Sequence, residues 1–491
     1  MRTTLLVAVL LAGSAHAFCG FYVAGGGAEL FNNATQVVLM RDGTKTVLSM
    51  QNNYQGPPEN FAMVIPVPVV LQKENVKTLP RDVFVHVDQL DAPRLVEYWE
   101  QDPCSERRRE KEKVLERKMF KNLGAALAYD DAAALVKVEA QFTVGEYEIV
   151  ILSAKDALAL EQWLKQNKYK IPEGAEPLFR PYIQQGMKFF VARVDVSKVT
   201  FKDGMAMLSP LRFHYDSEKF ELPVRLGLIN AKDKQDLIIH ILAKNQRYEV
   251  ANFPNATIPT NIDLVPSAKN EFGPFYVSLF DRTLKQNPGA VITEYAWQAT
   301  SCDPCPTAPL TESDMLTFGS DVLPVKAGDP YNPASGFVLT RLHARYDKTS
   351  LGEDLVFKAA KGLEGGREFD REQEGLRQTA VASDYNNFQG RYAIRYPWTG
   401  EVKCTDPLWG VWGGNPNGSK ETIAAKDTAF QKRDPELLAK LAEADVPVFE
   451  VKGRKKLSGV ALRAPAAPIE EKKPEPAVAP TETKRWWEFW K

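Results

Sequence analysis

Two cysteines separated by two residues form the part of this sequence best suited to chemistry. Cys302-Asp303-Pro304-Cys305 follows a strand-like stretch at residues 290–300. Thiols at this spacing exchange disulfides when a helix N-terminus stabilises the attacking thiolate. Pro306 and Pro309 delay any following helix, and no strand–helix–strand pattern precedes the pair. We therefore expect a structural disulfide and keep redox catalysis by Cys302 and Cys305 as the alternative.

The cysteine count limits how these thiols can pair. The chain contains Cys19, Cys104, Cys302, Cys305 and Cys404. In an oxidising compartment cysteines pair, so an odd number leaves one thiol free or bonded to a partner. We expect at most two bridges, with Cys302 and Cys305 bonded to each other, to Cys104 or to Cys404. A zinc site is disfavoured, because no histidine lies close to the single C-x-x-C.

Histidines are the next candidates for chemistry. His86, His214, His240 and His343 show no H-x-H or H-x-x-x-H spacing, and each lies in a strand-like run. A hydrogen-bonded structural role is the expected one for each. The sequence contains no Walker loop, G-x-S-x-G, H-E-x-x-H or EF-hand pattern. It therefore predicts no catalytic residue, no cofactor and no metal, and it supports no enzyme class.

Residues 1–17 have the pattern of a signal peptide and so predict where the protein is located. One positive charge precedes the apolar run at residues 5–11, and small residues precede a cleavage site after Ala17. Phe18 is not the small residue that a lipoprotein signal places before its cysteine, which here would be Cys19. We therefore expect a signal peptide cleaved after Ala17 and a secreted or periplasmic protein.

The amino-acid composition and net charge indicate which classes of binding partner to expect. The formal net charge is −1, with 44% hydrophobic and 25% charged residues, as in an ordinary globular protein. A near-neutral chain does not suit nucleic acid, so we expect no nucleic-acid partner.

Most of the secondary-structure elements that the sequence predicts around the cysteines and histidines are strands. Residues 37–48 predict a hairpin, because Asp42-Gly43 suits a type I′ turn. Pro66 and Pro68 place the strand before them at a sheet edge. Further strands are predicted at residues 61–65, 83–87, 136–144, 147–152, 188–196, 237–242 and 337–346.

Helical signals are fewer. Ser153-x-x-Asp156 predicts the start of a helix through Lys165, with Ala157, Leu160, Trp163 and Leu164 as its buried stripe. Other helices are predicted at residues 105–121, 175–185, from Glu312 and at 434–444, and residues 250–288 are predicted as long loops between short strands. The fold class is β-rich α+β, with antiparallel sheets and a few inserted helices.

We expect two or three domains. The predicted boundaries are a β-rich unit at 18–152 with the charged helix inserted, an α+β unit at 153–300 and a cysteine-containing unit at 301–462. Residues 463–491 predict a disordered linker of Pro, Ala, Glu and Lys that ends in an aromatic tail.

The aromatic tail is a candidate contact surface. It contains Trp486, Trp487, Phe489 and Trp490, flanked by Lys484, Arg485 and Lys491. Indole rings suit the membrane–water interface, and the cations could meet lipid phosphates. Docking onto the chain's own domain, or into a partner's groove, is an equally weighted alternative.

Several short stretches together resemble one bacterial family of secreted proteins, catalogued as domain of unknown function 2330. Their order spans roughly residues 18 to 350, and no activity comes with the resemblance. It implies an exported envelope protein. The stretches are Phe18-Cys19-Gly20, Leu30-Phe31-Asn32-Asn33, residues 60–68, Trp163-Leu164 with Asn167-Lys168-Tyr169, residues 209–213, residues 222–226 and Thr340-Arg341-Leu342.

These observations favour an exported envelope protein that is a binding or structural component, with an unknown envelope partner. The alternative is a thiol–disulfide oxidoreductase that uses Cys302 and Cys305.

Overall fold

A computed structural model of the chain describes most of its middle and none of its ends. The described residues are 21–24, 31–55, 61–104, 138–167, 169, 175–202, 205–230, 234–324, 335–347, 350, 352–367, 371–372, 375–416, 418 and 422–425. The leader, Cys19, the predicted helices at 105–121 and 434–444, and the C-terminal linker with its aromatic tail lie outside this set.

The fold is β-rich α+β, as predicted. The described residues form five α-helices: α1 (Asp82–Asp91), α2 (Ala157–Gln166), α3 (Glu176–Gln184), α4 (Phe272–Gln286) and α5 (Glu312–Phe318). Short 3-10 helices are η1 (Lys73–Asn75), η4 (Val196–Lys198), η5 (Arg225–Asn230), η6 (Pro266–Asn270) and η7 (Ser320–Val322). None of the helices in the described ranges has the length and apolar character needed to cross a membrane.

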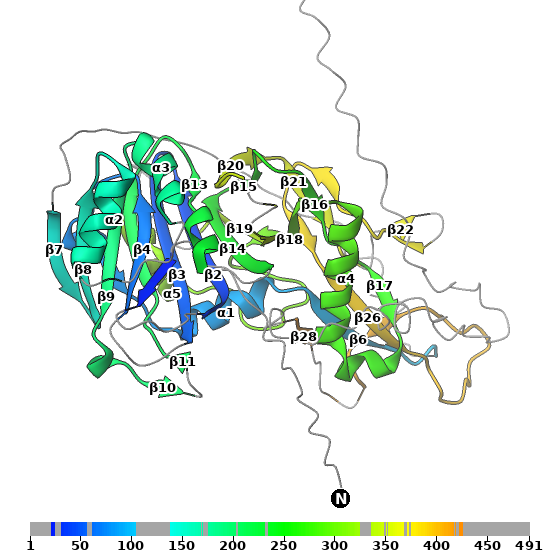
Figure 1. Ribbon diagram of the computed structural model, residues 1–491. Coiled ribbons are helices and arrows are strands. Elements are labelled where there is room, and N and C mark those ends of the chain that lie inside the picture. The colour runs from blue at the N-terminus through cyan, green and yellow to red at the C-terminus, as the bar shows by residue number, and fades with distance from the viewer. Residues whose placement is uncertain are drawn as a thin grey trace, which may run out of the picture.

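A large mixed sheet forms the centre of the molecule (Figure 1). Its middle order is β3-β2-β14-β19-β18, in which β2 and β14 run parallel and the other neighbours antiparallel. Those five strands are β2 (Phe31–Asp42), β3 (Lys45–Gln55), β14 (Gln235–Lys244), β18 (Val291–Gln298) and β19 (Phe337–Tyr346). Its outer strands are β5 (Val76–Thr78), β10 (Phe201–Lys202), β11 (Met205–Ala206), β12 (Leu211–Asp216), β16 (Asn255–Thr257), β21 (Gly362–Gly365), β24 (Val381–Ser383) and β25 (Asn387–Gln389).

Alternation along β2 explains why this sheet is covered on both faces. Val37 and Leu39 point into one apolar core, whereas Val38 and Met40 point into another. Because successive side chains of a strand point to opposite faces, this continuous apolar run requires a layer on each side. The predicted hairpin joins β2 to β3, and its two-residue loop is Gly43-Thr44, one residue later than predicted, with Gly43 supplying a positive φ of +55°.

A second sheet covers one face of the central sheet. Its order is β1-β4-β9-β8-β7, from β1 (Phe21–Ala24), β4 (Phe61–Val67), β7 (Val138–Val144), β8 (Tyr147–Ser153) and β9 (Lys188–Val194). Met63 and Ile65 of β4 pack against the central sheet, and Val64 packs on the other side, beneath α2 and α3. Asp156 caps α2 by accepting a hydrogen bond from the backbone N–H of Ala159 at 2.7 Å.

The other face of the central sheet carries α1 and α5, so the layers run helix, sheet, sheet, helix. A third sheet extends from this side, with order β17-β26-β6-β27 and β28 beside β6. Its strands are β6 (Arg94–Glu100), β17 (Ile262–Leu264), β26 (Arg391–Tyr396), β27 (Trp412–Gly413) and β28 (Thr422–Ala424), and α4 packs across it. Two small sheets complete the fold: β13 (Glu221–Leu222) with β20 (Leu355–Ala360) and β15 (Arg247–Val250), and β22 (Arg371–Glu372) with β23 (Gly375–Leu376).

The predicted strand at residues 83–87 is wrong, because these residues lie in helix α1. Val83, Val85 and Val87 alternate like a strand, but Val85 is 50% exposed. The buried apolar residues are Val83, Phe84, Val87 and Leu90, which follow the three-to-four spacing of a helix face.

The loops predicted for residues 250–288 are also wrong in part, because residues 272–286 form helix α4. Pro274 lies in the first turn, where its missing N–H costs nothing. Phe272, Phe275, Tyr276, Leu279 and Phe280 then form a buried stripe that is mostly aromatic.

The edge position predicted from Pro66 holds for only half of β4. Residues 62–64 lie between β1 and β9, whereas residues 65–67 pair only with β9 among the described strands. Pro66 therefore falls where no second neighbour in the described part needs its N–H.

Candidate functional site

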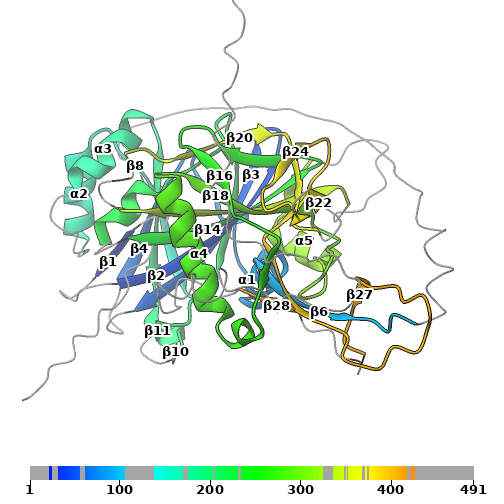
Figure 2. The ribbon, with the colours of Figure 1, turned by 90° about the vertical axis from the view of Figure 1, so that its right-hand side faces the viewer.

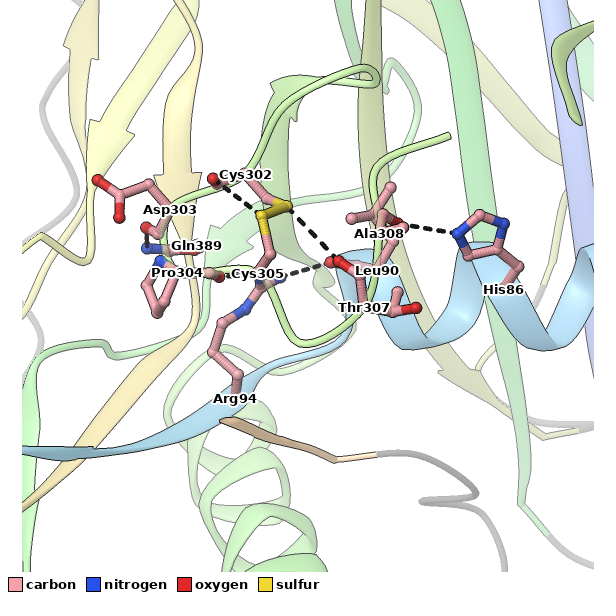
Figure 3. Close-up of a disulfide and its surroundings, with 10 residues drawn as sticks. All are labelled: His86, Leu90, Arg94, Cys302, Asp303, Pro304, Cys305, Thr307, Ala308 and Gln389. Atoms are coloured by element: carbon pink, nitrogen blue, oxygen red, sulfur yellow. Dashed lines mark hydrogen bonds between the residues drawn. A yellow bond between two sulfur atoms is a disulfide. The ribbon is translucent and has the colours of Figure 1, made fainter. Parts of the chain in front are cut away.

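The C-x-x-C motif forms a surface loop after β18, closed by a disulfide (Figure 3). Cys302 and Cys305 are bonded to each other, with their Cα atoms 5.0 Å apart. Cys302 is half-buried and Cys305 is exposed. The structure thus has the local pairing, one of the alternatives left open by the sequence.

A buried arginine attaches this loop to α1. Arg94, the first residue of β6, donates from Nη1 to the carbonyl of Pro304 at 3.0 Å and from Nη2 to the carbonyl of Leu90 at 2.7 Å. Figure 3 shows its guanidinium between the loop and the end of the helix. Burial lowers the pKa of Arg94, although Tyr295 and Asp91 act in the opposite direction. Arg94 therefore couples the position of the loop to the C-terminus of α1.

Other contacts hold the loop from both sides. Gln389 donates to the carbonyl of Asp303 at 2.7 Å, and Arg367 pairs with the Asp303 carboxylate at 2.7 Å. On the α1 side, His86 Nε2 lies 2.8 Å from the carbonyl oxygen of Ala308, and its Nδ1 lies 3.2 Å from a carboxylate oxygen of Asp314. His86 was predicted in a strand, and it lies instead on the helix that the loop contacts.

The surroundings of the sulfurs differ from those of a reactive thiol. Helix α5 begins at Glu312, capped by Thr311, so its N-terminus is several residues past Cys305. Cys305 Sγ lies 3.0 Å from the carbonyl oxygen of Cys302, and Cys302 Sγ lies 3.9 Å from that of Thr307. Carbonyl oxygens carry partial negative charge and would disfavour a thiolate, whereas helix N–H groups would stabilise one.

On another side of α1 lies a buried charge network. Its core is Arg341 of β19, which donates to Asp88 at 2.7 Å, to Asp91 at 2.8 Å and to Glu294 at 2.7 Å. The two aspartates belong to α1 and Glu294 to β18 (Figure 1). Arg341 is 1% exposed, and its three carboxylate partners are at most 8% exposed. We define the buried charge network as Asp88, Asp91, Asp236, His240, Glu294, Arg341, His343 and Arg345.

Two histidines extend the network along the sheet. His240 Nδ1 lies 2.6 Å from Asp91 Oδ2. His343 lies between two carboxylates, with Nδ1 2.8 Å from Glu294 and Nε2 3.1 Å from Asp236. Its ring stacks on Phe280 of α4, with centroids 3.7 Å apart. Both are hydrogen-bonded core histidines, in agreement with the role expected from the sequence.

The carboxylates decide the charge state of their basic partners. Burial would lower the pKa of His343, but the charge of Glu294 and the hydrogen bond to Asp236 outweigh it and raise that pKa. The same competition raises the pKa of Arg341, where Asp88 and Asp91 outweigh burial. For Asp236, burial acts to raise the pKa, and the contacts with His343 and Arg345 lower it overall. The contacts of Asp236, Arg341, His343 and Arg345 therefore favour the charged form of each of these four groups.

Part of the network has the ligand types of a metal site. Atoms of Asp88, Asp91 and His240 lie within 4.8 Å of one another. However, Arg341 Nη1 already donates to both aspartates, so its guanidinium fills the position that a cation would take. These residues fit a structural ion-pair cluster better than a metal centre.

The remaining sequence candidates are widely separated. Cys104 and Cys404 form the second disulfide, with Cα atoms 5.5 Å apart, in the segments that follow β6 and β26 of the third sheet. His214 of β12 lies 3.1 Å from the side-chain nitrogen of Asn75. Cys19 and the four tail aromatics, Trp486, Trp487, Phe489 and Trp490, lie outside the described residues.

Sequence reasoning missed the charge network, although one signal for it was present. Arg341, His343 and Arg345 alternate along the largely apolar strand β19, so all three point to one face. That face had to be covered by acids from elsewhere. The sequence could not show which acids, because Asp88 and Arg341 are separated by 253 positions.

Comparison with known families identifies the chain and leaves its chemistry open. Comparison with curated proteins and with solved structures gives no match. Residues 13–358, more than half of the chain, match the family described as uncharacterized protein conserved in bacteria, DUF2330. This chain therefore belongs to that bacterial family of uncharacterized proteins.

Proposed function

We propose that this chain is an exported bacterial envelope protein with a structural or binding role. The observation that carries the proposal is the pairing of four cysteines as Cys104–Cys404 and Cys302–Cys305. Disulfides persist in oxidising compartments and are rare in the bacterial cytosol. The leader pattern of residues 1–17 agrees with such a destination.

The charge network supports a structural role. Its acids and bases are paired with one another and almost fully buried, so they serve packing and orientation in the described state. Catalytic groups, by contrast, have to reach a substrate.

The test is export of the full chain in a bacterial host, followed by fractionation and disulfide mapping. We expect the mature protein to begin at Phe18, to leave the cytosol and to yield a disulfide-linked peptide pair containing Cys104 and Cys404. A matched variant without residues 2–17 should stay in the cytosol with reduced thiols. An uncleaved, reduced and cytosolic wild-type chain would contradict the proposal.

A thiol–disulfide oxidoreductase is the second candidate, favoured by the exposure of Cys305. In such an exchange, a substrate dithiol would be oxidised to a disulfide while the Cys302–Cys305 bond is reduced to two thiols. The test is pH-dependent alkylation of the reduced protein. A redox role requires one of the two thiols to react with a pKa well below that of an ordinary cysteine; ordinary reactivity of both would eliminate it.

A further inference from the structure

An aromatic surface lies at the free end of the third sheet. We define the aromatic lobe as residues 97–104, which are the end of β6 and the segment after it, together with residues 395–413. Figure 2 shows the orange part of the lobe projecting away from the body of the molecule beside β6 and β27. The lobe contains Trp99, Trp398, Trp409 and Trp412, all half-buried. Val402 and Leu408, in the same lobe, are 38% and 42% exposed.

These side chains are mounted on a rigid frame. The buried carboxylate of Glu100 accepts hydrogen bonds from the backbone N–H of Trp398 at 3.1 Å and of Gly410 at 2.8 Å. Trp99 stacks on Tyr396, with ring centroids 4.9 Å apart. The Cys104–Cys404 disulfide joins the two chain segments of the lobe. The aromatic surface is therefore held in place before any partner arrives.

A preorganised, partly exposed set of indoles is typical of a contact surface. Tryptophan contributes a large buried area on binding and is enriched among the residues that dominate interface energies. Exposed apolar patches on a folded domain usually mark such a contact.

The end of the chain has the composition and the reach to fill this role. The described chain ends at Ala425, directly after β28, whose backbone pairs with β6 of the same sheet. From Ala425 to Lys484 the chain advances 484 − 425 = 59 positions. Fully extended, that length reaches about 200 Å, so distance does not prevent the tail from returning to the lobe.

The charges of the two segments are opposite. Among the exposed charged side chains of the lobe, three are acids, Asp102, Glu401 and Asp406, and one is a base, Lys403, which gives 1 − 3 = −2. Residues 484–491 contain Lys484, Arg485 and Lys491 against Glu488, which gives 3 − 1 = +2. The tail also supplies aromatic rings to pack on the indoles, and cations that can lie over them.

We propose that residues 484–491 dock on the aromatic lobe of the same chain. Because the tail is tethered, docking is an intramolecular event, and a contact too weak for two separate molecules suffices.

The experiment uses the purified mature chain with both disulfides intact and a photoreactive benzoylphenylalanine at position 489. After irradiation, we expect crosslinked peptides from residues 97–104 or 395–413, with a yield that does not change on dilution. Crosslinks to another part of the chain would overturn the proposal, as would crosslinks to a second copy that increase with concentration. Because the protein is purified, this result does not depend on whether export occurs as proposed.

Matched variants test the lobe itself. Leu408→Ser combined with Trp409→Ala should lower the crosslink yield by about fivefold or more, since interface residues of this kind contribute on the order of 1 kcal/mol each. Tyr385→Ala, which removes an aromatic side chain 46% exposed outside the lobe, should leave the yield unchanged. Near-ultraviolet circular dichroism and disulfide mapping verify that each variant is folded.

Vesicles of phosphatidylethanolamine and phosphatidylglycerol test whether the tail binds a membrane instead of the lobe. We expect lobe crosslinks to persist in their presence. Transfer of the crosslinks from the lobe to lipid would assign the tail to the bilayer and overturn self-docking.

Discussion

The buried charge network and the C-x-x-C loop contact the same helix and stabilise it by different means. The network holds Asp88 and Asp91 of α1 through the fixed charge of Arg341, out of contact with water. The loop holds the C-terminal end of α1 through Arg94 and the carbonyl of Pro304, and its own shape depends on a disulfide at the surface. The stability that the charge network contributes should therefore depend on pH, and the stability that the loop contributes should depend on reductants. The two contributions can be measured separately.

The largest expected effect comes from Arg341→Met. The substitution leaves Asp88, Asp91 and Glu294 buried without their common cation, and loss of one partner of a buried ion pair costs about 3–5 kcal/mol. Urea denaturation of the mature protein measures the loss. Arg341→Lys, which keeps a charge but not three donors in a plane, should lose less. A loss below about 1 kcal/mol for Arg341→Met would mean that the network does not stabilise α1.

Replacing both loop cysteines should have a smaller effect. For Cys302→Ser with Cys305→Ser, the chain-entropy model gives about 2 kcal/mol, because the closed loop is short. The same urea titration, run with and without a dithiol reductant, provides the measurement, and Cys104–Cys404 remains in the variant as an internal reference. If this variant were less stable than Arg341→Met, the ranking of the two contacts would be reversed.

The pH dependence should separate the two contacts next. His343 has a raised pKa, so its contribution is fully present below the unfolded value of about 6.5 and is lost as pH rises through the folded value. Each unit of pKa difference corresponds to about 1.4 kcal/mol. We expect the stability difference between wild type and His343→Gln to shrink from pH 6 toward pH 9. The variant with Cys302→Ser and Cys305→Ser should keep the wild-type pH dependence of stability. If its stability difference from wild type also shrank between pH 6 and pH 9, the loop and the charge network would not be independent.

The smallest effect should come from the outer face of the loop. Asp303 is 61% exposed in its ion pair with Arg367, and exposed pairs contribute about 0–1 kcal/mol. Asp303→Asn should therefore change the free energy of unfolding by less than about 1 kcal/mol in low salt, with the difference fading in high salt. A larger loss would mean that the side chain of Asp303, rather than the disulfide, maintains the loop.

Local signals predicted much of this fold from sequence. The hairpin around Gly43, the capped helix at Asp156 and the strand at residues 337–346 each depend on neighbours a few residues apart, and all three were found. Helix α1 was misread because valines at every second position resemble a strand when viewed alone. The burial of Phe84 and Leu90 distinguishes the helix from a strand, and the sheet beneath these residues determines that burial.

The candidate site was less accessible to sequence reasoning. The Cys302–Cys305 pairing could be stated only as one of several, since spacing does not fix connectivity. The charge network depends on contacts such as Asp91 with His240, which are 149 positions apart. Long-range pairs of this kind follow from the strand order of the central sheet, and no local pattern contains that order.

The Cys104–Cys404 disulfide closes a covalent ring across 300 positions of sequence. A protease that cuts a single bond anywhere between these two cysteines opens the ring without releasing a fragment. The disulfide keeps the pieces joined next to the third sheet, where β27 pairs with β6. In a compartment rich in proteases, such a nicked chain would run as one species until a reductant separated it, and it could keep its shape after its backbone is no longer continuous.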